Sequence, residues 1–325
     1  MLTLVTGASG FVGSLLVPSL LDAGHAVRAL GRDPERVRDA LEPYLELDAE
    51  DVPIVRGDAI MGEGLDRALA DVEVAYYLIH SMESARGQAM AFHERDRLAA
   101  RNFAAAAARA GVRRIVYLGG LLPAPGAQNG RGSAAATVSR HLESRAEVER
   151  ILLGAVPDSL ALRASIVIGA RSRAFRLLVR LVERMPVLAL PAWRRYRTAP
   201  IDQRDVLAML VAGASAPVGG RKLDIGGPEV LCYGEMLTRI ADLMLVRRRA
   251  ISLGVNMTGI AGRVAASIAG EDPELVVPLM EGLRWDLLAA DDGAAELLGV
   301  HLHSFDAAVE HALAEWEEFE PLAAR

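Results

Sequence analysis

Cysteine and lysine are nearly absent from this chain of 325 residues. Cys232 is the only cysteine, which excludes an intrachain disulfide and a zinc site built from cysteine pairs. Lys222 is the only lysine, so every other member of the 36 Lys and Arg residues is an arginine. A lone thiol fits a reducing compartment, and a catalytic lysine has only one position available.

Basic charge and long apolar runs are also lacking. The net charge of −6 argues against a general nucleic-acid-binding protein, because phosphate contacts need a basic face. No stretch reaches the roughly 18 uncharged apolar residues of a membrane-spanning helix. The apolar residues after Met1 stop at Gly7 and follow no cationic segment, so we expect no signal peptide. These absences predict a cytoplasmic protein without integral membrane association.

The remaining pattern alternates short apolar runs with helical periodicity, which is typical of βαβ units and a parallel sheet. The expected strands are Leu2–Thr6, Ala26–Leu30, Val52–Arg56, Val72–Ile79, Arg114–Leu118 and Ser159–Ala164. The expected helices are Phe11–Ala23, Pro34–Leu45, Gly87–Ala110 and Thr137–Leu153, with Gly24 and Gly111 ending two of them. This order predicts an α/β fold with a Rossmann-type doubly wound parallel sheet.

The second half of the chain is less regular. We expect residues 1–164 to form the core, 201–225 to return to it, and 165–200 with 226–325 to form a smaller C-terminal cap on the substrate side. The segment Leu122–Ala136 is rich in glycine, proline and small residues, which predicts a mobile loop. Because ligands of open α/β sheets bind outside the carboxyl ends of the strands, this loop is expected to border a site.

The strongest local motif runs from Thr6 to Gly13, directly after a predicted strand and at the start of a predicted helix. Gly7 permits a tight turn, Gly10 allows a pyrophosphate to approach the backbone, and Gly13 allows close helix packing. The helix N-terminus offers free N–H groups to the phosphates. The motif predicts dinucleotide binding by Gly7, Ser9, Gly10, Phe11, Val12 and Gly13.

The end of the second strand bears on the choice between NAD and NADP. Arg32 stands there, and an arginine pairs with the 2′-phosphate of NADP. Asp33 is a rival that would bind the ribose of NAD, but its place before Pro34 suits a helix N-cap. Arg28 is a weaker candidate for the phosphate, with an exposed strand position as its alternative. We therefore expect NADP(H) rather than NAD(H).

Two further strand ends carry candidate site residues. Asp58 and Ala59 follow the third strand, where the carboxylate would lie beside the adenine; a turn aspartate is the alternative. The fourth strand ends at Ile79-His80-Ser81, where we expect Ile79 and His80 near the nicotinamide ribose and Ser81 near the substrate. A purely structural role for His80 stays open.

Together these motifs resemble the extended and atypical short-chain dehydrogenases/reductases, closest to NmrA-like and nucleoside-diphosphate-sugar-epimerase-like NAD(P)-binding proteins. The motifs are Thr6-Gly-x-x-Gly-x-x-Gly13, Gly57-Asp58, Asn102, Val112–Leu118 and Pro200–Val206, over about residues 1–230 and more faintly to near 310. The resemblance implies a Rossmann core with a bound nicotinamide cofactor and says little about the substrate.

The family's catalytic tyrosine, followed four residues later by a lysine, is missing here. Aligned on the helix near residue 146, the two positions hold His141 and Arg145, and Gly119 and Gly120 stand where the family has a serine. One interpretation makes His141 the acid/base and Arg145 a fixed cation for cofactor ribose or phosphate. The other is a decayed site that binds NADP(H) without turnover, as in a sensing or scaffold protein.

Arginines crowd the segment from Arg163 to Arg204, which holds ten of them and two acidic residues. Arg171 and Trp193 are the candidate substrate residues, and an anionic small molecule, an acidic partner or cofactor phosphates would suit the charge. A solvated basic face is the alternative. His301 and His303 lack further ligands at metal spacing, so we expect no metal site. The sequence leaves a homodimer open.

Overall fold

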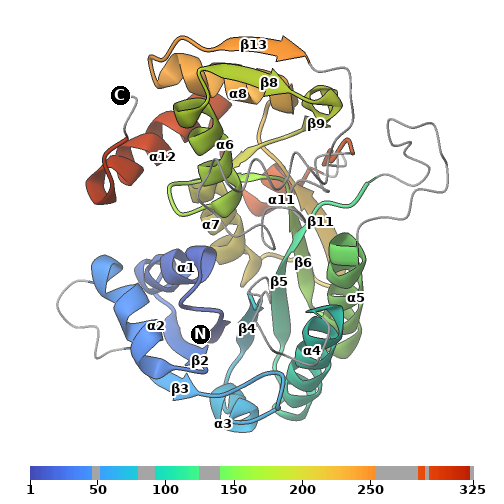
Figure 1. Cartoon of the computed structure of the whole chain (residues 1–325). Coiled ribbons are helices and arrows are strands. Elements are labelled where there is room, and N and C mark those ends of the chain that lie inside the picture. The colour runs from blue at the N-terminus through green and yellow to red at the C-terminus, as the bar shows by residue number, and fades with distance from the viewer. Residues whose placement is uncertain (46–51, 80–91, 124–139, 253–284, 290–292, 323–325) are drawn as a thin grey trace.

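The computed structural model describes residues 1–45, 52–79, 92–123, 140–252, 285–289 and 293–322. Its centre is a sheet of seven parallel strands. These are β1 (Leu2–Thr6), β2 (Ala26–Gly31), β3 (Ile54–Arg56), β4 (Val74–Tyr77), β5 (Arg114–Gly120), β6 (Leu160–Ala164) and β11 (Arg221–Ile225). Their order in space is β3-β2-β1-β4-β5-β6-β11 (Figure 1). The predicted Rossmann-type doubly wound sheet is confirmed.

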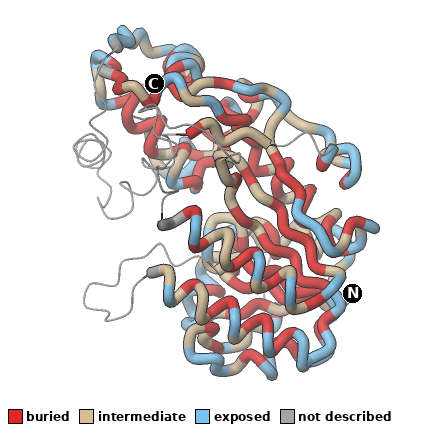
Figure 2. The backbone as a smooth tube through the Cα atoms, turned by 90° about the vertical axis from the view of Figure 1, so that its right-hand side faces the viewer, coloured by how far each residue is buried: buried red, intermediate tan, exposed pale blue. Residues whose placement is uncertain are grey.

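Helices cover both faces of this sheet because successive strand residues point to opposite sides. Tyr76 packs into the core beneath α1, α2, α7 and α11, whereas Tyr77 packs into the core beneath α3, α4 and α5. The helices on the two faces are α1 (Phe11–Asp22), α2 (Pro34–Leu41), α7 (Gln203–Gly213) and α11 (Ala294–Leu298), then α3 (Leu65–Leu69), α4 (Phe92–Arg109) and α5 (Arg140–Ala155). In Figure 2 the buried stretches run through the strands and the inner sides of these helices.

The helix ends show how closely local signals fix the bounds. Gly24 and Gly111 have φ of +78° and +70°, the left-handed conformation that favours glycine after a helix. The helix expected over Pro34–Leu45 is instead α2 followed by a 3₁₀ turn over Glu42–Tyr44. Helix α3 was not predicted, because five residues carry too little periodicity to be recognised.

A second hydrophobic core lies in the C-terminal part of the chain, above the sheet unit in Figure 1. Its elements are α6 (Arg173–Arg184), β8 (Val187–Leu190), a 3₁₀ turn (Ala192–Arg195), α8 (Tyr233–Leu243), β13 (Arg249–Ser252) and α12 (Phe305–Phe319). Shorter strands complete this part: β7 (Val167–Ile168) with β10 (Ile201–Asp202), and β9 (Arg197–Thr198) with β12 (Leu231–Cys232). The predicted C-terminal region is therefore present, while the boundaries at 164, 201 and 226 stay a prediction.

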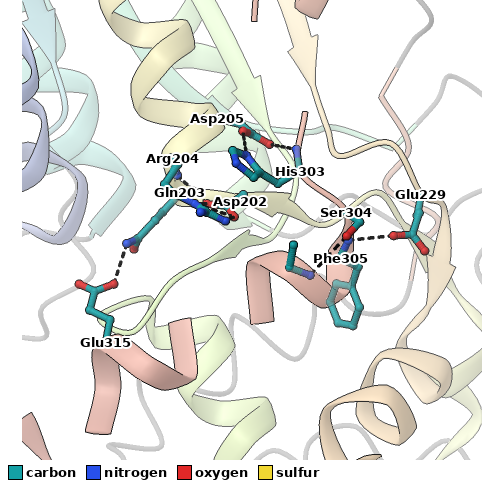
Figure 3. Close-up of polar contacts among 10 residues, drawn as sticks. Asp202, Gln203, Arg204, Asp205, Glu229, His303, Ser304, Phe305 and Glu315 are labelled. Atoms are coloured by element: carbon teal, nitrogen blue, oxygen red, sulfur yellow. Dashed lines mark hydrogen bonds and ion pairs between the residues drawn. The ribbon is translucent and has the colours of Figure 1, made fainter. Parts of the chain in front are cut away.

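Polar contacts join the two cores where α7 begins (Figure 3). The buried Asp205 carboxylate accepts a hydrogen bond from the backbone N–H of His303 at 2.9 Å and contacts its Nδ1 at 2.6 Å. Gln203 donates to Glu315 of α12 at 2.7 Å. These partners are 98 and 112 residues apart in the sequence, so contacts between distant segments hold α12 and the residues before it against the sheet unit. Within the described ranges, no helix has the length and apolar character needed to cross a bilayer.

Candidate nicotinamide nucleotide site

The turn between β1 and α1 has a backbone that only glycine fits. Gly7 has φ of +68°, and a Cβ there would lie 2.7 Å from the carbonyl oxygen of Leu78. A Cβ on Gly13 would lie 2.2 Å from the carbonyl oxygen of Gly7. The turn is closed by a 2.9 Å hydrogen bond from Gly10 N–H to Gly7. The glycines therefore leave the backbone of this turn open at the start of α1.

Helix α1 begins with its N-cap at Gly10, a residue that has no side chain to cap the first N–H groups. Uncapped N–H groups at a helix N-terminus carry partial positive charge and suit an anion. Ser9, Gly10, Phe11 and Val12 line a cavity at this point. A diphosphate fits the cradle because the glycines leave it open and α1 supplies donors.

The cavity has a volume of about 750 Å³, which is within the usual size of cofactor and ligand sites. Its wall includes the predicted Asp58, Ala59, Ile79, Arg145 and Arg171, together with the glycine turn and Arg32. Among the described lining residues six are arginine and one is acidic. The arginines are Arg32, Arg36, Arg95, Arg145, Arg171 and Arg173. This balance gives the cavity a positive potential suited to phosphate groups.

Neighbouring residues at the end of β2 have different roles. The Asp33 carboxylate accepts hydrogen bonds from the backbone N–H groups of Glu35 at 3.1 Å and Arg36 at 3.3 Å, so it caps α2 as expected. Arg32 is exposed and lines the cavity. Arg36, in the first turn of α2, lines it as well and was not predicted.

Arg28 does not reach the cavity wall. Its guanidinium donates to the carbonyl oxygens of Ala68 at 2.7 Å and Ala70 at 2.8 Å, at the end of α3. Cations suit helix C-termini because unpaired carbonyls carry partial negative charge there. Arg28 is thus a half-buried strand residue whose guanidinium contacts the end of α3, away from the residues that line the cavity.

Asp58 lines the cavity but its carboxylate serves the local turn. Its Oδ1 accepts hydrogen bonds from the backbone N–H groups of Ile60 at 2.7 Å and Met61 at 3.3 Å. Asn102 of α4 fixes the same turn by donating to the carbonyl oxygens of Ala59 at 3.0 Å and Ile60 at 2.8 Å. The arrangement shapes the cavity wall beside β3.

Helix α5 brings Arg145 to the cavity. Its guanidinium donates to the backbone oxygen of Leu118 at 3.3 Å and lies 3.5 Å from the phenolic oxygen of Tyr117. Its Nε is buried and has no hydrogen-bond partner among the described residues. Burial raises the pKa of Tyr117, while Arg145 acts in the opposite direction. His141 falls in the first turn of α5, but its side chain lies outside the described part of the structure, as do His80, Ser81 and residues 124–136 of the predicted loop.

The two candidate substrate residues lie in different places. Arg171 lines the cavity and donates to Ser14 Oγ and to the Tyr44 hydroxyl, each at 3.1 Å, so it stands beside α1 and the phosphate turn. Trp193 is 3% exposed and packs edge-on against Tyr233 in the C-terminal core. Its ring is part of that core and is not among the cavity-lining residues, which corrects the expectation of a substrate contact.

Five of the ten arginines in the 163–204 segment form ion pairs with acidic residues. Arg163 pairs with Asp224 and lies 4.0 Å from Glu149, Arg197 pairs with Asp286 at 2.8 Å, and Arg204 pairs with Asp202 at 2.6 Å. Arg176 and Arg180 both contact Glu320 and the ring of Trp316. Half of the expected basic surface is therefore paired with acids, most of them from other parts of the sequence, and Arg171 and Arg173 are its members at the cavity.

The far end of the cavity was not predicted. It is lined by the hydroxyl-bearing residues Ser165, Thr198 and Tyr233 and by apolar side chains from several segments. The apolar members are Ile166, Val167, Ala174, Leu177, Leu178 and Leu287. No sequence motif joins these positions, because the fold alone brings them together. In the described part of the chain, no group of three or more His, Cys, Asp or Glu residues is placed to hold a metal.

Comparison with known proteins agrees with this architecture. Residues 7–153 match a family model described as NAD(P)H-binding. A ceramide reductase from Caulobacter vibrioides is 29% identical over 216 residues, which are 66% of this chain and 62% of that protein. The matched segment thus spans less than two thirds of this relative.

Two solved structures share the fold across nearly the whole chain. An NADPH-dependent quinone oxidoreductase from Escherichia coli, complexed with NADPH, gives a TM-score of 0.72 at 19% identity, covering 96% of this chain and 100% of the other. UDP-glucuronic acid 4-epimerase from Bacillus cereus, with UDP-glucuronic acid and NAD, gives 0.70 at 17%, covering 98% and 100%. Both structures therefore share the fold of this chain, and residues 7–153 within it match the NAD(P)H-binding model.

Proposed function

We propose that this chain is an NADP(H)-dependent oxidoreductase that acts on a small carbonyl- or quinone-like substrate. The observation that carries the proposal is the continuity of the cavity, which runs from the phosphate turn at Gly10 to the hydroxyl-lined end at Ser165. A cavity lined both by the phosphate turn and by apolar and hydroxyl-bearing side chains of the C-terminal part suits a cofactor together with a small substrate. When bound, the nicotinamide supplies or accepts a hydride; the chain's residues bind, orient and exclude water.

Preference for NADP(H) rests on the end of β2. Arg32 and Arg36 both line the cavity, while the Asp33 carboxylate is occupied in capping α2. Guanidinium groups pair strongly with a phosphate, and the acid that would favour the ribose of NAD is committed elsewhere.

Arg145 is proposed to hold the nicotinamide ribose. Its buried Nε has no partner among the described residues and lies in a side chain at the cavity wall. A ribose hydroxyl would accept a hydrogen bond from Nε. A buried donor without an acceptor costs free energy. His141, one turn earlier on α5, is proposed as the proton donor, because an imidazole exchanges protons near neutral pH and a guanidinium does not.

A second candidate is a non-catalytic NADP(H)-sensing or scaffold protein. The observation that favours it is the absence of the family's tyrosine and lysine pair, with His141 and Arg145 in those positions. The single cysteine supports a cytoplasmic location for either function, and a homodimer or an anionic ligand beside Arg171 stays compatible with both.

One assay separates the two functions. NADPH oxidation is followed over a panel of quinones and carbonyl compounds, with wild-type protein and with His141→Ala. The oxidoreductase proposal expects slow turnover on at least one acceptor and a loss of about 10²-fold or more in the variant, the usual contribution of a positioned acid. Tight NADPH binding with no turnover on any acceptor would establish the sensing alternative.

A further inference from the structure

Three hydroxyl groups meet at the end of the cavity away from the phosphate turn. Ser165 directly follows β6, Thr198 ends β9, and Tyr233 begins α8. The Ser165 Oγ and Thr198 Oγ1 atoms are 2.8 Å apart, and Thr198 pairs with Leu231 of β12, two residues before Tyr233. The backbone N–H of Ser165 donates to Ile225 of β11 at 3.1 Å, so the serine is fixed against the sheet.

Burial differs along this row of hydroxyls. Thr198 is 1% exposed and Tyr233 is 2% exposed, whereas Ser165 is half-buried. All three line the cavity. Ser165 is therefore the member with most access to a ligand, and the other two stand behind it.

Either hydroxyl can be the donor in the contact between Ser165 and Thr198. Each hydroxyl has one proton and two lone pairs, so Ser165 can accept from Thr198 and still donate its own proton. When an acceptor lies in the cavity beside Ser165, Thr198 donates to Ser165 and the Ser165 proton is directed at that acceptor.

The surroundings select the kind of partner. This end of the cavity is walled by the apolar side chains of Ile166, Val167, Ala174, Leu177, Leu178 and Leu287. Arg171 is engaged with Ser14 and Tyr44 beside the phosphate turn, and Arg173, which also lines the cavity, has an interaction partner of its own. An apolar wall with one directed donor suits an uncharged molecule that carries a hydrogen-bond acceptor.

We propose that Ser165, backed by Thr198 and Tyr233, donates a hydrogen bond to the carbonyl oxygen of an uncharged, apolar substrate. This inference rests on the proposed function, because it names the substrate class of the same cavity. Ser165 is a binding and specificity residue here: no bond forms or breaks at its hydroxyl. A site built around such a donor discriminates against analogues that lack the acceptor, because the buried donor would stay unpaired.

Calorimetric titration with NADP⁺-loaded protein tests binding without turnover. The probes are 1-indanone, indane, which lacks the carbonyl, and 1-indanone-5-carboxylate, which adds a charge. The variants are Ser165→Ala, Ser165→Thr, which keeps a hydroxyl, and Thr198→Val, which interrupts the row. Ser159→Ala, at the opposite end of the same strand and away from the cavity, is the control. Melting temperature and NADP⁺ affinity are measured for each.

The proposal expects 1-indanone to bind wild type about tenfold more tightly than indane and more tightly than the carboxylate, and to lose about tenfold in Ser165→Ala. Ser165→Thr and Ser159→Ala retain binding, and Thr198→Val shows an intermediate loss. The infrared carbonyl stretch of bound 1-indanone lies at lower frequency in wild type than in Ser165→Ala. Equal affinity in wild type and Ser165→Ala, or tighter binding of indane or the carboxylate, overturns the inference. Failure of NADP⁺ itself to bind counts separately, against the proposed function, and the indanone titration is then read on the protein alone.

Discussion

The guanidinium of Arg145 on α5 lies 3.5 Å from the phenolic oxygen of Tyr117 on β5, beneath the wall of the nucleotide cavity. This contact helps to fix the Arg145 guanidinium, a permanent cation, at the helix position where the resemblance leads us to expect a lysine. A cation fixed on a strand residue can bind a ribose or phosphate, but it cannot exchange protons at neutral pH.

Replacing Arg145 should therefore weaken cofactor binding. We expect Arg145→Ala to reduce NADPH affinity about 10-fold to 100-fold, the effect of losing a hydrogen bond from a charged donor. Arg145→Lys should retain part of the NADPH affinity that Arg145→Ala loses. Tyr117→Phe should reduce the affinity less than Arg145→Ala does. Fluorescence titration with NADPH gives the affinities. Arg150→Ala, an exposed position on the same helix, is the control; unchanged affinity in Arg145→Ala would remove this residue from the site.

Two glycine substitutions should have opposite effects. In Gly13→Ala the new Cβ would lie 2.2 Å from Gly7 O, so the turn must distort and NADPH binding should be lost. In Gly154→Ala, inside α5, no heavy atom lies within 4 Å of the new Cβ. Removing a helical glycine should raise the free energy of unfolding by about 0.5–1 kcal/mol with binding intact.

Circular dichroism shows whether Gly13→Ala is folded, and chemical denaturation measures stability. A folded Gly13→Ala protein with normal NADPH affinity would contradict the assignment of the turn.

Much of the sheet unit could be predicted because its signals are local. Alternating apolar runs and helical periodicity gave the strands and long helices, Gly7, Gly10 and Gly13 gave the turn, and Asp33 before Pro34 gave the cap of α2. Each depends on the conformational preference of a few neighbouring residues. Such preferences act within one turn or one strand, so the sequence of that segment is enough to predict them.

The rest depends on contacts between distant segments. Arg176 and Arg180 looked like a basic face because their partner, Glu320, is 140 or more residues away. Trp193 looked like a ligand contact, but the packing of α8 buries it. No sequence motif marked Ser165, because its proposed role depends on Thr198, which lies on β9, 33 residues away in the sequence. Composition and spacing cannot show which of these residues meet.

Cofactor preference has a separate test. Arg32→Ala should weaken NADPH binding by about 1.5–3 kcal/mol, the worth of a charge-assisted hydrogen bond, and leave NADH nearly unchanged. Arg38→Ala is the matched control, because that exposed arginine pairs with Glu35 on the same helix. Isothermal calorimetry with both nucleotides provides the comparison. Equal losses for NADPH and NADH in Arg32→Ala would refute the assignment.

Acid stability should depend on Asp158. Its carboxylate accepts a hydrogen bond from Arg114 Nε at 2.9 Å, and Arg114 is almost fully buried. Hydrogen bonds from Arg114 hold the pKa of Asp158 below its ordinary value. A lowered folded-state pKa stabilises the fold above the unfolded pKa of about 3.9, and the contribution is lost as the pH falls through the lower folded value.

We expect Asp158→Asn to cost about 1–2 kcal/mol at pH 7, a modest figure because solvent screens a carboxylate that is 39% exposed. The difference from wild type should shrink below pH 4. Urea unfolding at pH 7 and pH 3 checks this. Asp66→Asn, which removes an exposed pair with Arg109, should change little at either pH. A constant Asp158→Asn difference across that range would show that its charge is not involved.

The most direct test of the whole account is calorimetric titration of the purified wild-type protein with NADPH, NADP⁺, NADH and NAD⁺. Saturable binding of one nucleotide per chain is predicted, with the phosphorylated forms tighter. No heat of binding with any of the four, from a protein that is folded by circular dichroism, would contradict the claim that the Gly7–Gly13 turn holds a dinucleotide.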